Sequence, residues 1–366
     1  MTTYLLAGGG TAGHVNPLLA VADRLRERDP AADVLVLGTA EGLESRLVPA
    51  RGYELITIEK VPFPRRPNGA ALRFPGRFRR SVRAVADVIA QRRVDVVVGF
   101  GGYVATPAYL AARRAGVPVA IHEANAKPGL ANRLGARFAA RVGVAFRGTP
   151  LPRAEFVGMP LRREIETLDR VGRRAEAAEL FGLDPARPVL LVTGGSLGAR
   201  RINRTMVGSA SSVVDAGWQV LHVTGAASDV DDPGIDGYRM VEYADRMDLA
   251  LAIADVAVSR AGAATVSELS ALGIPAVYVP YPVGNGEQRF NAADVVGAGG
   301  GLLVDDAAFL PEWVEREFVP LLADRERRSE MGRAAASVGA LDGTDRMVAL
   351  VDGALALPGA PPSPGA

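Results

Sequence analysis

The sequence contains no cysteine among its 366 residues. Disulfide bonds and thiolate metal sites are therefore excluded, which fits a reducing compartment. No stretch approaches the ~18 consecutive apolar residues that a membrane-spanning helix needs, so we expect no such helix. The first residues, MTTYLLAGGGTAGH, lack the basic and long apolar regions of a signal peptide and are typical of a first strand. We therefore expect a cytoplasmic location.

Neither charge sign dominates the whole chain, whose formal net charge is +1. The balance hides an asymmetry, because residues 1–160 carry 23 Lys and Arg against 12 Asp and Glu, a net of +11, and the remainder carries 19 against 29, a net of −10. The N-terminal half should favour an anionic partner, for which nucleic acid, acidic lipid and phosphate are candidates. Hydrophobic residues make up 48%, enough for a sizeable core, and the length predicts two domains.

Short apolar segments alternate with helix-length segments such as 16–28 and 106–115. The short segments are apolar throughout, which is typical of parallel strands covered on both faces. Their alternation with helix-length segments indicates βαβ units. The pattern restarts after VGMPLR (157–162), so we expect an α/β fold of two Rossmann-like domains whose parallel sheets face across a cleft. The expected strands are 4–8, 33–39, 53–59, 94–100 and 117–123, followed by 188–195, 218–225, 254–260 and 274–281.

The expected domains are residues 1–160 and 161–357, with the last helix able to pack back on the first domain. The tail 358–366, PGAPPSPGA, is expected to be disordered because it consists only of Pro, Gly, Ser and Ala.

Each half opens with a strand that runs into a glycine-rich loop. The first, GGGTAGH, contains the G-x-G-x-x-G pattern of dinucleotide sites, at Gly8, Gly10 and Gly13. A helix that follows such a loop offers free N–H groups to an anion. A tight turn without a ligand is the alternative, and Glu41 is a poor match to the acidic residue of NAD sites.

The second loop, GGSLGAR, adds Ser196, which can cap the helix or bind a phosphate.

The segment SRAGAATVSE (259–268) also passes from a strand into a helix. Its small residues permit a close approach of ligand. Glu268 would lie in the first turns of the helix, where a carboxylate can bind ribose hydroxyls or complement the helix dipole.

Seven motifs in order resemble the MurG family of UDP-N-acetylglucosamine transferases of peptidoglycan assembly. They are GGGTAGHVNP, FGGYVATP, HEANAKPGLAN, GMPLR, GGSLGARRIN, SRAGAATVSEL and EQRFNA, and they extend from about Leu6 to Ala293. The resemblance implies the GT-B fold of glycosyltransferase family 28. It also implies inverting transfer of GlcNAc from UDP-GlcNAc to the C4 hydroxyl of the lipid-linked acceptor lipid I, giving lipid II, with cell-wall synthesis proteins as candidate partners.

The resemblance also implies the donor contacts. Arg162 and Ser196 would hold the diphosphate, Glu268 the ribose and the Ala244 backbone the uracil, while Gln288 and Asn125 would bind the sugar. The remaining contacts are Thr11, Ala12, Gly13, Ala263, Ala264, Thr265, Val266 and Ser267. Two residues depart from the family pattern, Met159 where Asn is common and Glu287 where Gln is frequent, and the second puts donor selectivity in doubt.

Only three histidines are present, at positions 14, 122 and 222. His14 ends the first glycine-rich loop and is the candidate general base, since imidazole exchanges protons near neutral pH. A ligand-binding or capping role is the alternative. We expect His122 to be a packed structural residue or to touch the acceptor at the cleft edge, and His222 to belong to the core.

Residues 61–86 contain seven Arg and no acidic residue. Such a segment, interleaved with aromatic residues, can dock on an anionic membrane surface. A solvated loop or a nucleic-acid site is the alternative, but no nucleic-acid-binding motif accompanies it, so we expect none bound. The candidate membrane patch is Leu72, Arg73, Phe74, Arg77, Phe78, Arg79 and Arg80.

The DVDD run (229–232) imitates a metal-binding D-x-D motif. We interpret it as a solvated turn and expect no cofactor and no obligate metal. Three other functions compete with the transferase: a nicotinamide-dependent oxidoreductase, a non-catalytic nucleotide-sugar or lipid-binding protein, and a related GT-B enzyme such as a UDP-GlcNAc 2-epimerase or a natural-product transferase.

Overall fold

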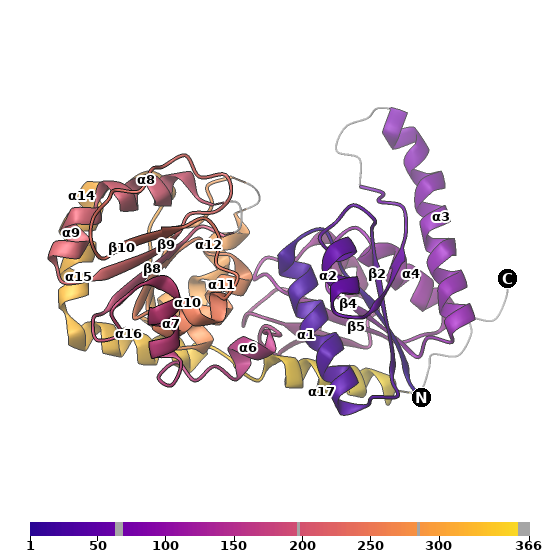
Figure 1. Ribbon diagram of the computed structural model, residues 1–366. Helices are drawn as coiled ribbons and strands as arrows, with labels where there is room; N and C mark the ends of the chain where they lie inside the picture. Colours follow the sequence, from indigo (N-terminus) through magenta and orange to yellow (C-terminus); the bar gives the residue numbers. More distant parts are fainter. Residues whose placement is uncertain (63–68, 196–197, 284–285, 358–366) are drawn as a thin grey trace. The chain divides into compact units, whose positions relative to one another are not determined.

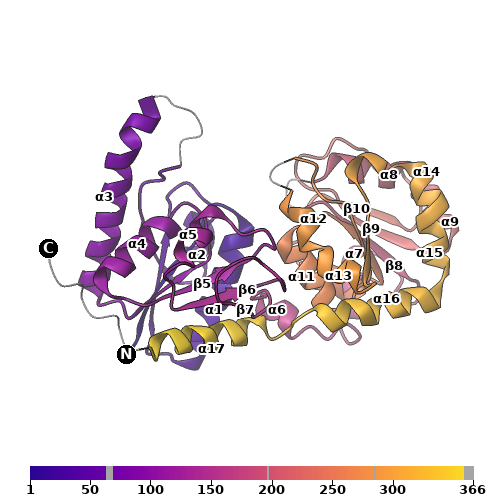
Figure 2. The same ribbon diagram turned by 180° about the vertical axis from the view of Figure 1, so that it is seen from behind.

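The computed structural model describes residues 1–62, 69–195, 198–283 and 286–357. They form two compact units (Figure 1). Unit 1 consists of Met1–Arg162 together with the chain from Asp342 on, and unit 2 is Arg163–Leu341. The last helix, α17 (Gly343–Leu355), therefore belongs to unit 1, where it packs against α1 (Ala12–Arg28) (Figure 2).

Unit 1 is built around a parallel sheet of seven strands in the order β3-β2-β1-β4-β5-β6-β7. The order reverses between β1 and β4, and ligands bind beyond the carboxyl ends of the strands at such a switch point. The strands are β1 (Thr3–Ala7), β2 (Asp33–Gly38), β3 (Glu54–Thr57), β4 (Val96–Gly99), β5 (Val119–Glu123), β6 (Arg141–Val144) and β7 (Ala154–Phe156), and the other helices are α2 (Glu44–Ala50), α3 (Gly69–Arg92), α4 (Ala105–Ala115) and α5 (Leu130–Gly135).

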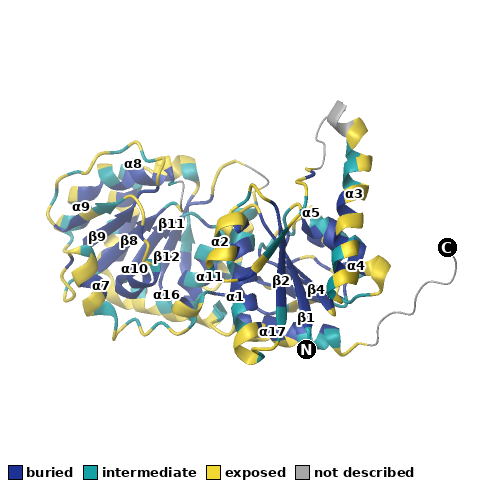
Figure 3. Cartoon of the chain, turned by 45° about the vertical axis from the view of Figure 1, so that its right-hand side comes forward, coloured by how far each residue is buried: buried dark blue, intermediate teal, exposed yellow. Residues whose placement is uncertain are grey.

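The central strands of unit 1 are buried on both faces, which explains their uniformly apolar sequences (Figure 3). Tyr4 and Leu6 of β1 point into a core closed by α1 and α17. Leu5 and Ala7 point to the opposite side, into a core closed by α3 and α4. Successive side chains of a strand alternate between faces, so each strand serves both cores.

Unit 2 repeats this plan with six parallel strands in the order β10-β9-β8-β11-β12-β13, which reverses between β8 and β11. The strands are β8 (Val189–Thr193), β9 (Gln219–Val223), β10 (Tyr238–Val241), β11 (Val256–Ser259), β12 (Ala276–Tyr278) and β13 (Gly301–Leu303). The helices are α6 (Arg163–Glu166), α7 (Arg174–Phe181), α8 (Arg200–Gly208), α9 (Ala210–Asp215), α10 (Met247–Ile253), α11 (Ala263–Ala271), α12 (Glu287–Asn291), α13 (Ala293–Gly297), the 3-10 turn η1 (Asp306–Ala308), α14 (Pro311–Trp313), the π-helical turn η2 (Val314–Phe318), α15 (Val319–Ala323) and α16 (Arg325–Val338).

The two sheets also begin in the same way. In unit 1 the carboxylate of Asp95, just before β4, accepts a hydrogen bond from Thr3 N over 2.8 Å. In unit 2 Asp255, just before β11, accepts one from Val189 N over 2.8 Å. Each carboxylate thus ties the first strand of its unit to the fourth. The repeat expected from the sequence is present in the strand order and in this contact.

The expected α/β fold with two parallel sheets is confirmed, and all nine expected strands are present. Helix α1 begins at Ala12, four residues before the expected start, and α4 begins at Ala105. The largest element that was not expected from the sequence is α3, a 24-residue helix that contains most of the basic segment. None of the described helices is both long and apolar enough to cross a membrane.

Two of the three histidines are buried in the cores. His122 Nε2 donates to the Gly158 carbonyl over 3.0 Å. His222 accepts from the Tyr238 hydroxyl over 2.8 Å and donates to Asn203 Oδ1 over 3.2 Å. Burial lowers the pKa of His122 to about 4 and the pKa of His222 to about 4, so both are neutral near pH 7. The expected core location of His222 is confirmed, and His122 is packed inside the fold.

These buried histidines predict a loss of stability in mild acid. In the unfolded chain these histidines become protonated below about pH 6.5, whereas in the folded chain they stay neutral until the pH falls to their folded pKa of about 4. Each histidine should therefore remove about 1.4 kcal/mol of unfolding free energy per pH unit within that window. Hydrogen exchange of β5 and β9 between pH 7 and pH 4.5 measures this loss of unfolding free energy. His222→Asn should flatten the pH dependence of the unfolding free energy at β9 alone. An unchanged dependence at β9 would contradict this.

Candidate active site

The first glycine-rich loop connects β1 to α1 at the switch point of unit 1. It places Thr11 at the N-cap position of α1 and His14 in the first turn of the helix. Gly10 has a φ of 89°, a left-handed conformation that favours glycine. Thr11 and Ala12 are exposed, and Gly13 and His14 are partly exposed. The loop therefore presents the predicted residues Thr11 to His14 at the carboxyl edge of the sheet.

The ring of His14 is held in one orientation by backbone. Its Nδ1 lies 3.1 Å from the carbonyl oxygen of Gly9 and 3.3 Å from the hydroxyl of Thr11. A carbonyl oxygen can only accept, so Nδ1 carries the proton in this contact. In the neutral ring Nε2 then holds the lone pair. This is the tautomer that a general base at Nε2 requires.

The loop after β4 closes on the same histidine. A methyl carbon placed on Gly101, whose φ is 99°, would lie 3.0 Å from His14 Nε2. A methyl carbon on Gly102, whose φ is 83°, would lie 2.6 Å from the carbonyl oxygen of Gly9. The missing side chain of Gly101 therefore leaves room for the imidazole, and that of Gly102 leaves room for the Gly9 carbonyl. The FGGYVATP motif is explained by this close approach.

A buried carboxylate that the sequence analysis missed lies beneath the loop. Glu44 is fully buried, and its Oε2 accepts a hydrogen bond from Gly10 N over 2.8 Å. Its Oε1 accepts from the backbone N–H and the hydroxyl of Thr39, over 2.9 and 2.8 Å. Burial raises the pKa of Glu44, but the hydrogen bonds from Gly10, Glu44 and Thr39 outweigh it, so the pKa is lowered. The group is ionised near neutral pH.

Glu41, which the sequence analysis compared with the acidic residue of NAD sites, is exposed. In the folded structure Gly9, Gly38 and Gly42 all contact the side chain of Glu44. A methyl carbon on any of the three would approach Glu44 within 2.1 to 2.5 Å. Glycines so spread along the chain reveal their common neighbour only in the folded structure.

The HEAN motif ends β5 with a second buried carboxylate, Glu123. It accepts hydrogen bonds from Asn125 N over 2.9 Å and from Gly129 N over 3.0 Å. The Asn132 side-chain amide donates to it over 2.9 Å. Glu123 thereby shapes the loop that carries Asn125, which is partly exposed at the same edge of the sheet.

These loops line one cavity of about 940 Å³ in unit 1. Its polar wall is formed by the glycine-rich loop, His14 and the ends of β4 and β5. Its apolar wall comes from α3, α4 and α5. The lining residues are Gly9, Gly10, Thr11, His14, Val61, Phe74, Phe78, Gly101, Gly102, Tyr103, Thr106, Leu110, Glu123, Asn125, Gly129, Leu130, Ala131, Asn132 and Leu134.

Helix α3 links this cavity to the surface. Phe74 and Phe78 line the cavity and stack on each other with ring centroids 5.4 Å apart. Leu72 is 86% exposed, and Arg73, Arg79 and Arg80 are also exposed. Arg77 instead donates to Glu59 over 2.8 Å. The expected patch residues thus lie together on one helix, with Arg77 held in an ion pair. Residues 63–68 of the basic segment lie outside the described part of the chain.

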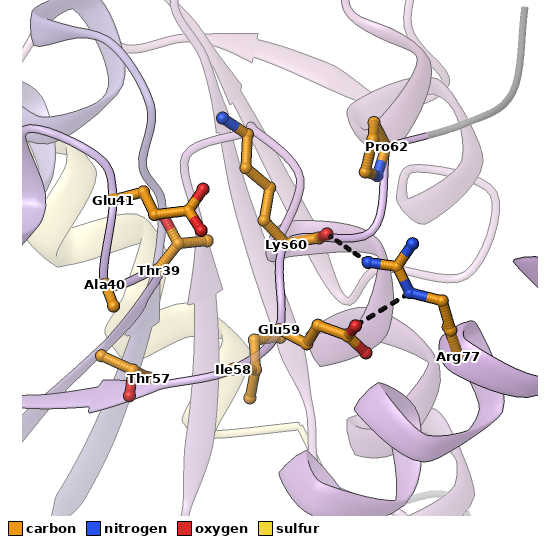
Figure 4. A pocket seen from close by; sticks show the side chains of 9 residues that line it. All are labelled: Thr39, Ala40, Glu41, Thr57, Ile58, Glu59, Lys60, Pro62 and Arg77. Atoms are coloured by element: carbon orange, nitrogen blue, oxygen red, sulfur yellow. Dashed lines mark hydrogen bonds and ion pairs between the residues drawn. The ribbon is translucent and has the colours of Figure 1, made fainter. Parts of the chain in front are cut away.

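A second cavity, of about 630 Å³, lies at the ends of β2 and β3 in unit 1 (Figure 4). Glu41 and Lys60 line it, together with the Glu59–Arg77 ion pair. The ammonium of Lys60 lies 5.5 Å from the ring centroid of Tyr103, a residue of the first cavity. This cation–π contact thus joins a residue that lines one cavity to a residue that lines the other.

In unit 2 the second glycine-rich loop follows β8 at the switch point. Ser196 lies outside the described residues. A methyl carbon on Gly198 would lie 2.2 Å from the Thr224 carbonyl oxygen, so the loop packs against the end of β9. Asn203 donates to that same carbonyl over 2.9 Å and accepts from His222. Asn203 therefore binds the end of β9, against which this loop packs.

The segment SRAGAATVSE joins β11 to α11 beside that loop. Ala263, Val266 and Ser267 are buried, and Ala264, Thr265 and Glu268 are partly exposed in the first turns of the helix. Arg260 is not directed to a ligand, because it donates to Asp306 over 2.6 Å and to two carbonyls after β12. The segment thus places Glu268 near the helix N-terminus, as expected.

The other expected donor residues are distributed over both units. In unit 2 Ala244 is buried after β10, and Gln288 accepts from Tyr281 N over 2.9 Å. Glu287 is partly exposed beside it. Arg162 is the last residue of the first stretch of unit 1 and is partly exposed. Met159 is buried in unit 1, where its backbone carbonyl lies close to Gly343.

The DVDD run lies in an irregular segment after β9. Arg204 donates to Asp229 over 2.5 Å, and Arg200 lies 3.4 Å from the same carboxylate. Asp232 accepts from Gly234 N over 2.9 Å, a local turn. Among the side chains described, no group of three or more His, Asp and Glu is arranged to hold a metal ion.

The burial of two histidines predicts that a histidine-specific reagent modifies His14 selectively. Diethyl pyrocarbonate acylates neutral imidazole, and His122 and His222 are fully buried. Peptide mass spectrometry after brief treatment should find the adduct at His14. Gly101→Ala should slow the reaction several-fold, because the added methyl group crowds Nε2. Comparable modification of His122 or His222 would contradict the described burial.

The comparisons with known proteins agree with this geometry. Residues 4–144 match the glycosyltransferase family 28 N-terminal domain, and residues 189–347 match the glycosyltransferase family 28 C-terminal domain. Together the two matches cover the six strands β1 to β6 of unit 1, apart from Thr3, and all six strands of unit 2.

Individual relatives match nearly the full chain. The UDP-N-acetylglucosamine--N-acetylmuramyl-(pentapeptide) pyrophosphoryl-undecaprenol N-acetylglucosamine transferase of Leifsonia xyli subsp. xyli is 69% identical over 351 residues, 96% of this chain and 98% of that protein. The protein of the same name from Streptomyces coelicolor is 53% identical over 356 residues, covering 96% and 98%. The crystal structure of MurG from Acinetobacter baumannii has a TM-score of 0.80 at 28% identity and covers 96% of this chain and 99% of that one.

The expected GT-B fold is confirmed by these matches. The chain belongs to glycosyltransferase family 28 and, within it, to the MurG family of N-acetylglucosamine transferases.

Proposed function

We propose that the chain transfers N-acetylglucosamine from UDP-GlcNAc to the C4 hydroxyl of the muramyl sugar of a pyrophosphoryl-undecaprenol-linked acceptor, the step from lipid I to lipid II. The names of the relatives that match 95% or more of the chain support this reaction. The observation that carries the proposal is the position of His14, whose ring lines the same cavity as Phe74 and Phe78 of α3.

His14 acts as the general base in this reaction. Nε2 takes the proton of the C4 hydroxyl while the hydroxyl oxygen attacks C1 of GlcNAc and the bond from C1 to the diphosphate breaks. The configuration at C1 inverts, so an α-linked donor gives a β-linked product. The hydrogen bond from Nδ1 to Gly9 O keeps the ring oriented, and it can strengthen as positive charge develops on the imidazole.

The donor is assigned mainly to unit 2. The carboxylate of Glu268 binds the ribose hydroxyls, and the Ala244 backbone reads the uracil edge. Ser196 and Arg162 contact the diphosphate, where a guanidinium can form two parallel hydrogen bonds. Gln288 and Asn125 bind the sugar. The remaining donor contacts come from backbone groups and small residues that let the donor approach closely, in Thr11 to Gly13 and in Ala263 to Ser267.

The departing UDP is stabilised by the protein itself. The first N–H groups of α11 have no partner within the helix and point to its N-terminus, where developing negative charge is favoured. We propose that these N–H groups supply this stabilisation and that the donor site requires no metal ion or cofactor.

The acceptor is assigned to the cavity of unit 1. Its polar wall at His14 suits a sugar, and its apolar wall at Phe74 and Phe78 suits the beginning of a lipid chain. The exposed arginines of α3 attract anionic headgroups, and Leu72 can enter the interface. We therefore place the protein on the cytoplasmic face of the membrane as a peripheral protein, without a role in nucleic-acid binding.

The reaction is tested by following UDP release from UDP-GlcNAc with and without a lipid I analogue. The transferase releases UDP only when the acceptor is present and yields a product one N-acetylhexosamine heavier. UDP release without the acceptor would instead indicate hydrolysis or epimerisation, and binding without turnover would indicate a carrier.

Loss of the base should affect chemistry and leave donor binding intact. His14→Ala is expected to lower kcat by about 10²- to 10⁴-fold, because the acceptor hydroxyl loses its proton acceptor. Calorimetric UDP affinity should stay within about twofold of the unmodified protein, since the donor is assigned mainly to unit 2. Full activity of His14→Ala would sink its assignment as base.

The membrane assignment predicts weaker vesicle binding when exposed arginines of α3 are removed. Arg79→Ala with Arg80→Ala should cost about 2 kcal/mol, or roughly thirtyfold in partition to anionic vesicles. The matched control is Arg325→Ala with Arg327→Ala, which removes the same charge from exposed positions on α16 of unit 2. Equal losses in both double variants would mean that only net charge matters.

A further inference from the structure

Glu44 and His14 contact opposite ends of one peptide group. The bond between Gly9 and Gly10 contributes the Gly9 carbonyl, which accepts from His14 Nδ1 over 3.1 Å. It also contributes the Gly10 N–H, which donates to Glu44 Oε2 over 2.8 Å. The sequence of contacts is therefore carboxylate, peptide group, imidazole. No part of the reaction described above uses Glu44.

A hydrogen bond to an anion polarises a peptide group. When its N–H donates to a carboxylate, the carbonyl oxygen becomes more negative and accepts a hydrogen bond more strongly. Glu44 is fully buried and ionised, so water does not screen this effect. The Nδ1–H of His14 thus faces a carbonyl strengthened by a negative charge. The same charge favours the imidazolium that forms when Nε2 accepts a proton.

The tautomer of His14 needs such help. In water a neutral histidine ring prefers its proton on Nε2, the nitrogen that a base must keep free. The contact with Gly9 O selects the opposite tautomer. A stronger acceptor at that carbonyl makes the selection more complete.

We propose that Glu44 is a positioning residue for the transfer, acting through the Gly9–Gly10 peptide group to hold His14 with its proton on Nδ1 and its lone pair on Nε2. The proposal rests on the role proposed above for His14 as the base. Glu44 itself touches no substrate, because the loop covers it.

The surroundings of Glu44 fit this role. Every group that faces its two oxygens in the contacts described is a donor: Gly10 N on one side, and Thr39 N and Oγ1 on the other. A glutamine would have to present its NH₂ to one of these donors. Gly9 and Gly42 leave room for the carboxylate, since a methyl carbon on either would lie within 2.4 Å of one of its oxygens.

The test compares Glu44→Gln with Thr39→Val in the full-length protein. Glu44→Gln removes the charge and keeps the shape. Thr39→Val removes one hydrogen bond to the same carboxylate but leaves the charge and the contact with Gly10 in place. Two-bond ¹H–¹⁵N correlation spectra report which ring nitrogen of His14 is protonated, and its signals are assigned by their loss in His14→Gln.

The expected result separates tautomer from packing. The spectra of the unmodified protein and of Thr39→Val show the proton on Nδ1, and Glu44→Gln shifts it toward Nε2. We expect Glu44→Gln to lower kcat about ten- to hundredfold, the range by which loss of an outer-shell partner of a metal-binding histidine lowers activity. The KM for UDP-GlcNAc stays within about twofold, and Thr39→Val keeps kcat within about threefold.

Two results would overturn the proposal. One is a proton on Nε2 of His14 in the unmodified protein, which is decisive even if Glu44→Gln does not fold. The other is an unchanged tautomer in folded Glu44→Gln. Failure of the proposed function is distinguishable, because the unmodified protein would then lack transferase activity while its spectra still show the tautomer.

Discussion

The proposed active site depends on the peptide group between Gly9 and Gly10. Its carbonyl orients His14, its N–H is held by Glu44, and Gly102 packs against it at a distance that excludes any side chain. Because β1 and β4 are neighbours at the switch point, the loops after both strands meet there. The catalytic geometry is therefore a consequence of strand order combined with glycine at the contact points.

The two units share a plan but fix their glycine-rich loops with different chemistry. In unit 1 the N–H of Gly10 is already donated to a buried carboxylate, so it is committed within the protein, and the negative charge beneath the loop opposes a bound diphosphate. In unit 2 the side-chain amide of Asn203 donates to the Thr224 carbonyl at the end of β9, which Gly198 approaches closely. This difference between the two loops supports the proposed assignment of the diphosphate to unit 2.

The sequence predicted much of the fold, because uniformly apolar strands bounded by glycine or proline have few alternatives. It also located His14, whose place after a strand and glycine-rich loop follows from local pattern. It missed Glu44, since a buried acidic residue at a helix start has no local signature and its contact with the glycine-rich loop lies 34 positions back, at Gly10. The ion pair of Arg77 was not predicted either, because its partner Glu59 lies 18 residues earlier, in the segment after β3.

Helix α3 connects the chemistry of the cavity to the surface. Phe74 and Phe78 belong to the wall of the cavity, while Leu72 and the arginines before and after them are exposed on the same helix. A lipid-linked acceptor has a polar head that must reach His14 and a chain that is costly to expose to water. If α3 lies at the membrane surface, the head can enter the cavity past the two phenylalanines while the chain stays in the bilayer. On the roles proposed above, one amphipathic helix would then serve both docking and substrate entry.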